Sequence, residues 1–218
     1  MDVGILGGTG PAGKALAARL ASIGMSVSIG SRSAERGEEI AAQLREKWGA
    51  RVPDLHGASN EVAAHCDLVV VATPWDSAVS TVSALKSSLA NKTVISMVSA
   101  LAREGKELVP LYPPRGSMAA QLAFALPEST IVGAFHHLPA SEMEDLDSDL
   151  DADVIIFSDD NDAREEVSAV INAMPGLHAV VAGSMSLASA VEAFTAVCVS
   201  INIRHKAHSY VKLAGLKR

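Results

Sequence analysis

Apolar residues in this chain fall into two patterns that alternate from the N-terminus onward. Short runs without polar interruption, such as DLVVVA at residues 67–72, are typical of strands buried on both faces of a sheet. Longer stretches between the runs have apolar residues at helical spacing. The runs predict strands at residues 3–6, 27–29, 67–72, 93–96 and 130–135. Such alternation predicts an α/β fold with a doubly wound parallel sheet.

The same alternation continues, on a smaller scale, towards the C-terminus. It predicts a strand at residues 154–157, a helix at 163–174, a strand at 178–181 and a long apolar helix from about Ser184. We therefore expect two domains. The first spans residues 1–140, and residues 141–218 form a small C-terminal α/β extension that ends in the long helix.

Composition and charge narrow the class of protein. The 218 residues are 49% hydrophobic and 20% charged, which excludes a disordered chain. No apolar stretch approaches the roughly 20 residues of a membrane-spanning helix, and no charged leader precedes the first apolar run. The net charge of −7 and the lack of a basic, aromatic pattern argue against nucleic acid. We expect a cytoplasmic protein without a membrane or nucleic-acid partner.

Two cysteines are too few for a disulfide framework or a conventional zinc site. Cys66 and Cys198 lie in apolar surroundings and have no C-x-x-C spacing. We expect both to be reduced packing residues, and we expect no metal.

A glycine-rich segment follows the first strand and opens the first helix. Residues 8–13, GTGPAG, fit the pattern G-x-G-x-x-G. In this geometry the first glycine allows a tight turn, the second lets a pyrophosphate approach the backbone, and the third lets helix and strand pack closely. The alternative is an ordinary tight turn. The flanking elements favour a Rossmann-type dinucleotide-binding domain with these cofactor-binding residues: Gly8, Thr9, Gly10, Pro11, Ala12 and Gly13.

The end of the second strand indicates which dinucleotide is bound. NAD enzymes usually place an acidic residue there, whereas this chain has Gly30-Ser31-Arg32. Ser31 can donate a hydrogen bond to a 2′-phosphate and Arg32 can pair with it bidentately. Arg36, four residues further on, either reaches the same phosphate or is an ordinary surface arginine. The pattern favours NADP(H) over NAD(H).

Several segments spread over the chain are similar to one family. They are GILGGTGPAG at residues 4–13, GSR at 30–32, ATPWDSAV at 72–79, AFHHLPA at 134–140, FSDDNDA at 157–163 and VEAF…NIRHK in the last helix. In these segments the chain resembles the NADPH-dependent reductases of coenzyme F420, an 8-hydroxy-5-deazaflavin. The resemblance implies hydride transfer between NADP(H) and F420, with the two rings stacked in a cleft that the C-terminal domain closes.

Three loops follow apolar strands and should meet at the carboxyl edge of the sheet, where ligands bind in such folds. They begin near Thr73, Val98 and His136. The expected contacts with the nicotinamide and deazaflavin rings are Thr73, Pro74, Trp75, Ser77, Val98, Ser99, His136, Leu138 and Ala140. The structural alternatives are a helix start for Thr73 and Pro74, core packing for Trp75, and a purely structural role for either His136 or His137.

The last helix carries two further features. Its cationic end either complements the helix dipole or binds the anionic tail of the deazaflavin, through Asn202, Arg204, His205 and Lys206. Its apolar face is either core or a dimer interface, formed by Leu187, Val191, Phe194, Cys198 and Ile201. We expect a homodimer.

The sequence shows no nucleophile–base pair and no paired carboxylates at an expected loop. Hydride transfer does not require them, because the cofactor rings carry the chemistry and the protein supplies alignment and exclusion of water. We therefore assign no catalytic side chain. Two alternatives use the same N-terminal domain: an NADP-dependent reductase of a small imine or keto acid, and a non-catalytic NADP(H) sensor.

Overall fold

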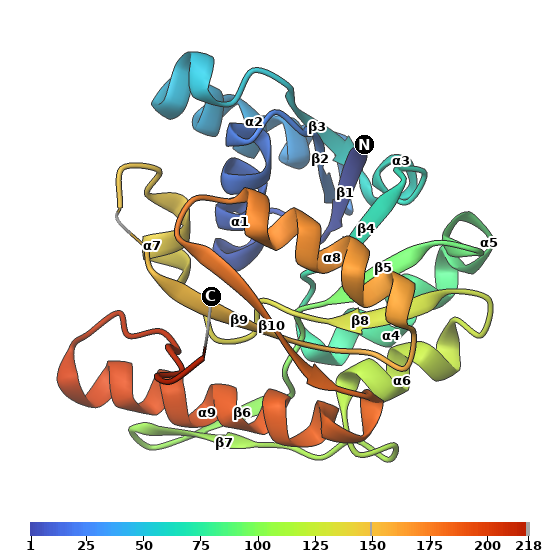
Figure 1. Ribbon diagram of the computed structural model, residues 1–218. Coiled ribbons are helices and arrows are strands. Elements are labelled where there is room, and N and C mark those ends of the chain that lie inside the picture. Colours follow the sequence, from blue (N-terminus) through green and yellow to red (C-terminus); the bar gives the residue numbers. More distant parts are fainter. Residues whose placement is uncertain (149, 217–218) are drawn as a thin grey trace.

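The computed structural model describes residues 1–148 and 150–216. Within them one eight-stranded sheet runs through the molecule in the order β10-β9-β8-β5-β4-β1-β2-β3 (Figure 1). Its strands are β1 (Asp2–Leu6), β2 (Ser26–Ser31), β3 (Leu55–Ser59), β4 (Leu68–Val71), β5 (Thr93–Ser96), β8 (Thr130–Gly133), β9 (Ala152–Phe157) and β10 (Leu177–Gly183).

The six strands from β3 to β8 are all parallel, which confirms the predicted doubly wound sheet. All seven strands predicted from apolar runs are present, within two residues at either end. Strand β3 was not predicted. Its sequence, LHGAS, combines a histidine, a glycine and a serine, so it lacks the continuous apolar run of its neighbours.

Strand β9 departs from the expected parallel pairing. It runs antiparallel to β8, and one registered pair, Gly133 with Phe157, joins the two strands at their last residues. Strand β10 is parallel to β9, so both strands run against the rest of the sheet. The prediction of parallel pairing throughout was wrong here. Between β8 and β9 the chain has only the short helix α7 (Ala140–Glu144), whereas a return to a parallel strand usually requires a longer crossover.

Helices cover both faces of the sheet and enclose two separate groups of buried apolar side chains. One group joins the sheet to α1, α2, α7 and α8, and the other joins it to α3, α4, α5, α6 and the start of α9. The bounds of these helices are α1 (Pro11–Ser22), α2 (Ala34–Trp48), α3 (Asn60–Ala63), α4 (Trp75–Ala84), α5 (Lys86–Leu89), α6 (Met118–Ala125), α8 (Asn161–Ala173) and α9 (Ala188–His205). Short 3-10 turns lie at Gly49–Arg51 and Met185–Leu187.

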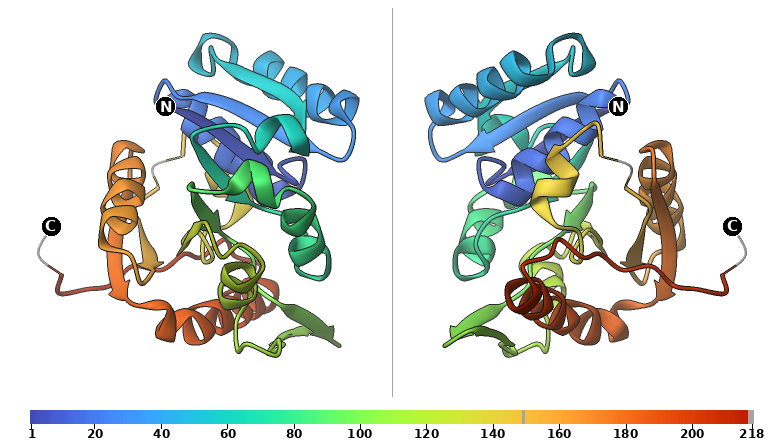
Figure 2. Two further views of the ribbon diagram at one scale, coloured as in Figure 1. Left: turned by 90° about the vertical axis from the view of Figure 1, so that its right-hand side faces the viewer. Right: turned by 90° about the vertical axis from the view of Figure 1, so that its left-hand side faces the viewer.

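A hairpin that the apolar pattern did not predict lies along α9, apart from the main sheet (Figure 2). It consists of β6 (Leu101–Glu104) and β7 (Glu107–Pro110), which pair antiparallel. An isolated two-stranded hairpin is marginally stable by itself. Here the backbone N–H of Leu108 donates to Ser200 Oγ on α9 at 2.9 Å, which helps to hold the hairpin on the helix.

Helix α9 corrects one expectation. With the preceding turn it spans 21 residues, Met185–His205, at a mean hydropathy of 1.5, and is long and apolar enough to cross a membrane by length and composition. The statement that no apolar stretch approaches this length was therefore wrong. Helices that pack in protein cores pass the same test, and α9 packs against β7 and α6.

Candidate functional site

The glycine-rich loop forms a tight, open turn at the start of α1. Gly7 has a φ of +68°, which glycine adopts without strain. A Cβ on Gly13 would lie 2.7 Å from Gly8 Cα, so its absence lets the helix pack closely on the loop. A Cβ on Gly10 would meet no heavy atom nearer than 3.9 Å. Gly10 caps α1 without a side-chain hydrogen bond, which leaves the first N–H groups of the helix available to an anion.

A cavity of about 760 Å³ extends from this loop along the carboxyl edge of the sheet. It is lined by Gly7, Thr9, Gly10, Pro11, Ala12, Ser31, Arg32, Arg36, Asn60, Ala72, Thr73, Pro74, Asp76, Ser77 and Thr81. Ten of the predicted cofactor-binding residues line it together; Gly8 and Gly13 shape the turn from behind. We call it the dinucleotide cavity.

Ser31 and Arg32 lie at the end of this cavity, as the second strand predicted. Ser31 closes β2 and is 8% exposed, whereas Arg32 is exposed. Arg36, in the first turn of α2, forms an exposed ion pair with Glu39 at 2.5 Å. Both arginines therefore line the cavity, but only Arg36 already has an acidic partner among the described residues.

A second cavity of about 320 Å³ adjoins the first. It shares Ala12, Ala72, Thr73 and Pro74 with the dinucleotide cavity, so the two lie side by side at the same edge of the sheet. Its other lining residues are Trp75, Met97, Val98, Ser99, Leu101, Phe135, His136, Leu138 and Thr195. We call it the ring cavity.

The register of the parallel strands explains why distant loops meet here. Leu6 pairs with Val71, Val71 with Ser96, and Ser96 with Gly133, so four strands end at one level. The loops that follow must converge on the same edge, as predicted.

Several polar atoms in this region are buried without a hydrogen-bond partner among the described residues. They include Thr73 Oγ1, where the two cavities meet, and both ring nitrogens of His136. Buried polar groups are nearly always paired in proteins, so these atoms point to a ligand. Burial, with a smaller effect from His137, lowers the pKa of His136 to about 3. The imidazole is therefore neutral and can donate one hydrogen bond and accept another.

The two adjacent histidines have different surroundings. His136 lines the ring cavity and stacks on Phe157, with ring centroids 5.7 Å apart. His137 Nε2 donates to the carbonyl oxygen of Val191 on α9 at 2.7 Å. His136 thus faces the cavity, and His137 is bound to the last helix.

Other predicted residues lie outside the ring cavity. Ala140 borders a small gap behind it, with Leu138 and Met143. Asn202 Oδ1 accepts the backbone N–H of Ser209 at 2.8 Å, and Arg204 pairs with Glu107 at 2.8 Å. These contacts support the structural alternative for Asn202 and Arg204 at the end of α9.

Several lining residues were not predicted as site residues, and Asn60 and Thr195 are polar examples. Asn60 follows β3, whose strand was itself not predicted. Thr195 lies in the middle of the apolar helix α9, where no local pattern marks it as part of a site. Among residues 1–148 and 150–216, no group of three or more potential metal ligands is present.

Similar proteins of known family identify the family of this chain. A family model described as "NADP oxidoreductase coenzyme F420-dependent" matches residues 2–100. An F420-dependent NADP reductase of Methanocaldococcus jannaschii is 35% identical over 211 residues, covering 94% of each chain. The chain belongs to this family. A second F420-dependent NADP reductase, from Methanothermobacter thermautotrophicus, is 29% identical over 100% of this chain and 94% of its own length.

Solved structures show how widely the fold occurs. A crystal structure from Arthrobacter sp. FB24 superimposes with a TM-score of 0.79 at 23% identity, covering 94% of this chain and 95% of that one. A Streptomyces aurantiacus imine reductase has a TM-score of 0.62 at 16% identity, covering 92% of this chain and 61% of its own. At these identities the likeness concerns the fold alone.

The residues of this member of the family fit both expected cofactors. The open space beside Gly10 and the free N–H groups of α1 suit a pyrophosphate. The ring cavity has apolar walls and the partnerless polar atoms of Thr73 and His136, which suit a flat heterocycle with hydrogen-bonding edges.

Proposed function

We propose that this reductase transfers a hydride between NADP(H), held in the dinucleotide cavity, and the deazaflavin of F420, held in the ring cavity. The observation that carries this assignment is that the two cavities adjoin and share Thr73 and Pro74 in their walls. Direct transfer requires the reacting carbons to approach to about 3–3.5 Å, so both rings have to share one enclosed space.

The dinucleotide end of the site depends on charge and on close approach of the backbone. The glycine-rich loop and the start of α1 bind the pyrophosphate, as the space beside Gly10 suggests. Ser31, Arg32 and Arg36 bind the 2′-phosphate. Strand β2 ends in Gly30-Ser31-Arg32 without an acidic residue, which favours NADP(H).

The ring end of the site depends on shape and on neutral hydrogen-bonding groups. When bound, NADP(H) and F420 supply the hydride donor and acceptor, so no side chain has to act as acid or base on carbon. Trp75, Val98 and Leu138 wall the cavity and exclude water. The neutral imidazole of His136 orients the deazaflavin through a hydrogen bond, and Ser99 and Thr195 close the far side.

We assign these tasks to two parts of the chain. Residues 1–140 hold NADP(H), and residues 141–218 close the deazaflavin cleft, because Thr195 on α9 lines the ring cavity. Ala140 lies next to this cavity rather than in it: it lines a small adjoining gap together with Leu138, which lines both.

Deuterium transfer tests the proposal. The protein is mixed with oxidised F420 and with NADPH labelled at either the (4R) or the (4S) position, and the reduced deazaflavin is analysed by mass spectrometry. We expect label from one of the two stereoisomers. Bleaching of F420 without label from either isomer would refute direct transfer. NADPH binding without any turnover would support the sensor instead.

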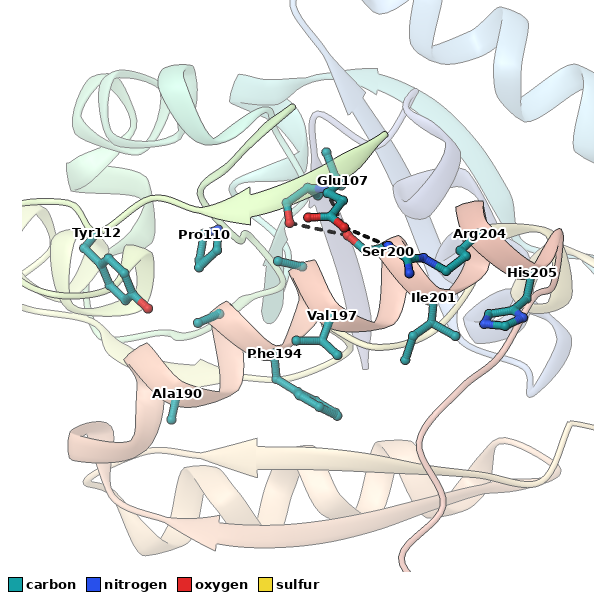
Figure 3. A pocket seen from close by; sticks show the side chains of 13 residues that line it. Glu107, Pro110, Tyr112, Ala190, Phe194, Val197, Ser200, Ile201, Arg204 and His205 are labelled. Carbon is teal, nitrogen blue, oxygen red and sulfur yellow. Dashed lines mark hydrogen bonds and ion pairs between the residues drawn. The ribbon is translucent and has the colours of Figure 1, made fainter. Parts of the chain in front are cut away.

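We also propose that the reductase is a homodimer that pairs through α9. Figure 3 shows Phe194, Val197 and Ile201 pointing away from the hairpin, and these side chains are 42%, 48% and 43% exposed. They border a groove of about 730 Å³. Large exposed apolar patches are rare on monomers, and a two-fold axis across α9 would cover this one with its own copy.

Light scattering tests the dimer. We expect a mass near twice 22.6 kDa for the wild type and a monomer for Val197→Glu. A monomeric wild type, or binding of the wild type to lipid vesicles through α9, would overturn this assignment.

We also propose a cytoplasmic location, without a membrane or nucleic-acid partner. This proposal rests on the net charge of −7 and on the unpaired Cys66 and Cys198.

A further inference from the structure

Glu192 on α9 is a buried acid that the hydride transfer does not use. It is 5% exposed, and both of its carboxylate oxygens accept backbone hydrogen bonds. The N–H of Met118 donates to Oε2 at 2.6 Å, and the N–H of Ala119 donates to Oε1 at 2.8 Å. These are the first two N–H groups of α6, and Ser117 Oγ accepts the third from Ala120. One helix thus caps the start of another with a charge that complements its dipole.

The same turn of α9 also holds two loops of the ring cavity. The carbonyl oxygen of Val191 accepts from His137 Nε2 at 2.7 Å. Thr195 Oγ1 lies 3.1 Å from Ser99 Oγ and donates to the carbonyl oxygen of His136 at 3.4 Å. The loops after β5 and β8 therefore share one support.

The hairpin adds a second connection between α6 and the cavity. It begins at Leu101, which lines the ring cavity, and the chain then continues to α6. Figure 3 shows the hairpin lying on α9 beside Ser200 and Arg204, which bind Leu108 and Glu107. Residues 97–126 thus form one segment that is attached to α9 at several points. Of these contacts, the one between Glu192 and the start of α6 is made by a buried acidic side chain.

We propose that Glu192 is a positioning residue for the deazaflavin: by binding the start of α6 it fixes the turn Val191–Thr195, and through it the two loops that wall the ring cavity. The proposal rests on the function proposed above. Among the described residues, none of α6, α9 or the hairpin after Leu101 lines the dinucleotide cavity, whereas Leu101 and Thr195 line the ring cavity, so we expect the larger effect at the ring end.

The chemistry of the contact makes it sensitive to protonation. Two N–H groups face two oxygens, and a protonated carboxyl has only one good acceptor oxygen. Burial raises the pKa of Glu192 to about 7, against the opposing effect of the two N–H groups. The elements around this turn carry other titratable or charged groups, although α6 carries none. They are His136 and His137 after β8, Arg103, Glu104, Lys106 and Glu107 in the hairpin, and Tyr112 and Arg115 before α6.

Glu192→Gln tests the proposal, because the amide keeps the size of the side chain but offers one acceptor where two are needed. We expect the KM for F420 to rise about tenfold, and the Kd for NADPH to change less than twofold. Glu107→Gln is the matched control: it breaks an exposed contact between the same hairpin and helix and should leave both constants unchanged. Ser117→Ala weakens the start of α6 without touching the carboxylate, and should lower the melting temperature alone.

A pH profile separates positioning from general stability. In the wild type the KM for F420 should rise as the pH falls through about 7. This acidic limb of the pH profile should be absent from Glu192→Gln. A limb due to the coenzyme itself would occur in both proteins. His136 and His137 do not produce it, since burial lowers both of their pKa values.

The outcomes are distinct. An unchanged KM for F420 in Glu192→Gln, or the same limb in both proteins, would overturn the proposal. If Glu192→Gln does not fold, the wild-type profile decides, because a KM for F420 independent of pH between 6 and 8 would also overturn it. A wild type that never reduces F420 would instead refute the function on which this proposal rests.

Discussion

The side-chain oxygen of Asn60 accepts a hydrogen bond from the backbone N–H of Gly7 at 3.0 Å. This contact ties the end of β3 to the start of the glycine-rich loop. Because Gly7 N–H can only donate, the atom facing it must be Oδ1, which leaves the NH₂ group of Asn60 on the other side. Asn60 lines the dinucleotide cavity, and no described residue accepts a hydrogen bond from its Nδ2. We infer that this group donates to an oxygen of the bound dinucleotide.

Asn60→Asp should therefore weaken NADPH binding while leaving the fold intact. Aspartate keeps the acceptor for Gly7, but it removes the donor and places a negative charge near phosphates. We expect the Kd for NADPH to rise at least tenfold, about 1.4 kcal/mol or more, in a fluorescence titration. Asn172→Asp is the control, since Asn172 makes a similar bond to Ala179 N–H at 2.8 Å away from both cavities. Equal effects of the two substitutions would contradict the inference.

Arg32→Ala should distinguish the two nicotinamide cofactors. Loss of a charge-assisted pair to the 2′-phosphate should weaken NADPH by about 2–3 kcal/mol and change NADH affinity little. Arg36→Ala should cost less, because Arg36 is already paired with Glu39. Calorimetric titration with both cofactors decides; equal losses for NADPH and NADH would show that Arg32 does not read the phosphate.

Two glycines of the loop should respond oppositely to substitution. Gly10→Val projects a side chain into open cavity, so it should abolish NADPH binding at an unchanged melting temperature. Gly13→Ala places its Cβ against Gly8, and should lower the melting temperature first. If Gly10→Val still binds NADPH, the pyrophosphate does not approach this backbone.

Gly133→Ala should disturb the ring cavity from a distance. A Cβ on Gly133 would overlap the ring of Phe157, which is fully buried and stacks on His136. We expect a loss of about 1–3 kcal/mol in unfolding free energy and a marked fall in F420 turnover, with NADPH binding retained. Urea unfolding and a turnover assay measure the two effects; unchanged turnover would mean that the stack does not orient His136.

The buried state of His136 predicts a dependence of stability on pH. Its ordinary pKa of 6.5 applies to the unfolded chain, and burial lowers the pKa to about 3 in the folded protein. The unfolded state therefore binds the proton more readily, and stability falls as the pH drops below 6.5. The contribution lost between pH 6.5 and pH 5 is about 2 kcal/mol. His136→Asn should remove this loss in urea unfolding at the two pH values, and an unchanged slope would contradict the prediction.

Much of the site could be predicted because parallel strands carry their following loops to one edge. Apolar runs located β1, β2, β4, β5 and β8, and their common edge brings Thr73, Val98 and His136 together. Asn60 was missed because its strand alternates small and polar residues rather than forming an apolar run.

Other features depend on tertiary packing that local patterns do not encode. His136 and His137 are adjacent and chemically identical, and only the position of Val191 on α9 determines which one faces the cavity. The reversed direction of β9 depends on the short connection through α7. Glu192 lies in an apolar helix, and its partners are backbone groups of α6 more than seventy residues earlier in the chain.

The narrow junction between β8 and β9 has a consequence for how the molecule opens. One registered pair joins the two strands, whereas β9 and β10 pair along nearly their whole length and α8 packs on β10. Residues 152–183 therefore form a strand–helix–strand unit with mainly internal backbone bonds, and such units open cooperatively below the free energy of global unfolding. Amide hydrogen exchange should give β9, α8 and β10 one shared protection level, below that of β1, β4 and β5. Phe157 at the end of β9 stacks on His136, so the unit that we expect to open before the central strands borders the cavity that a large coenzyme has to enter.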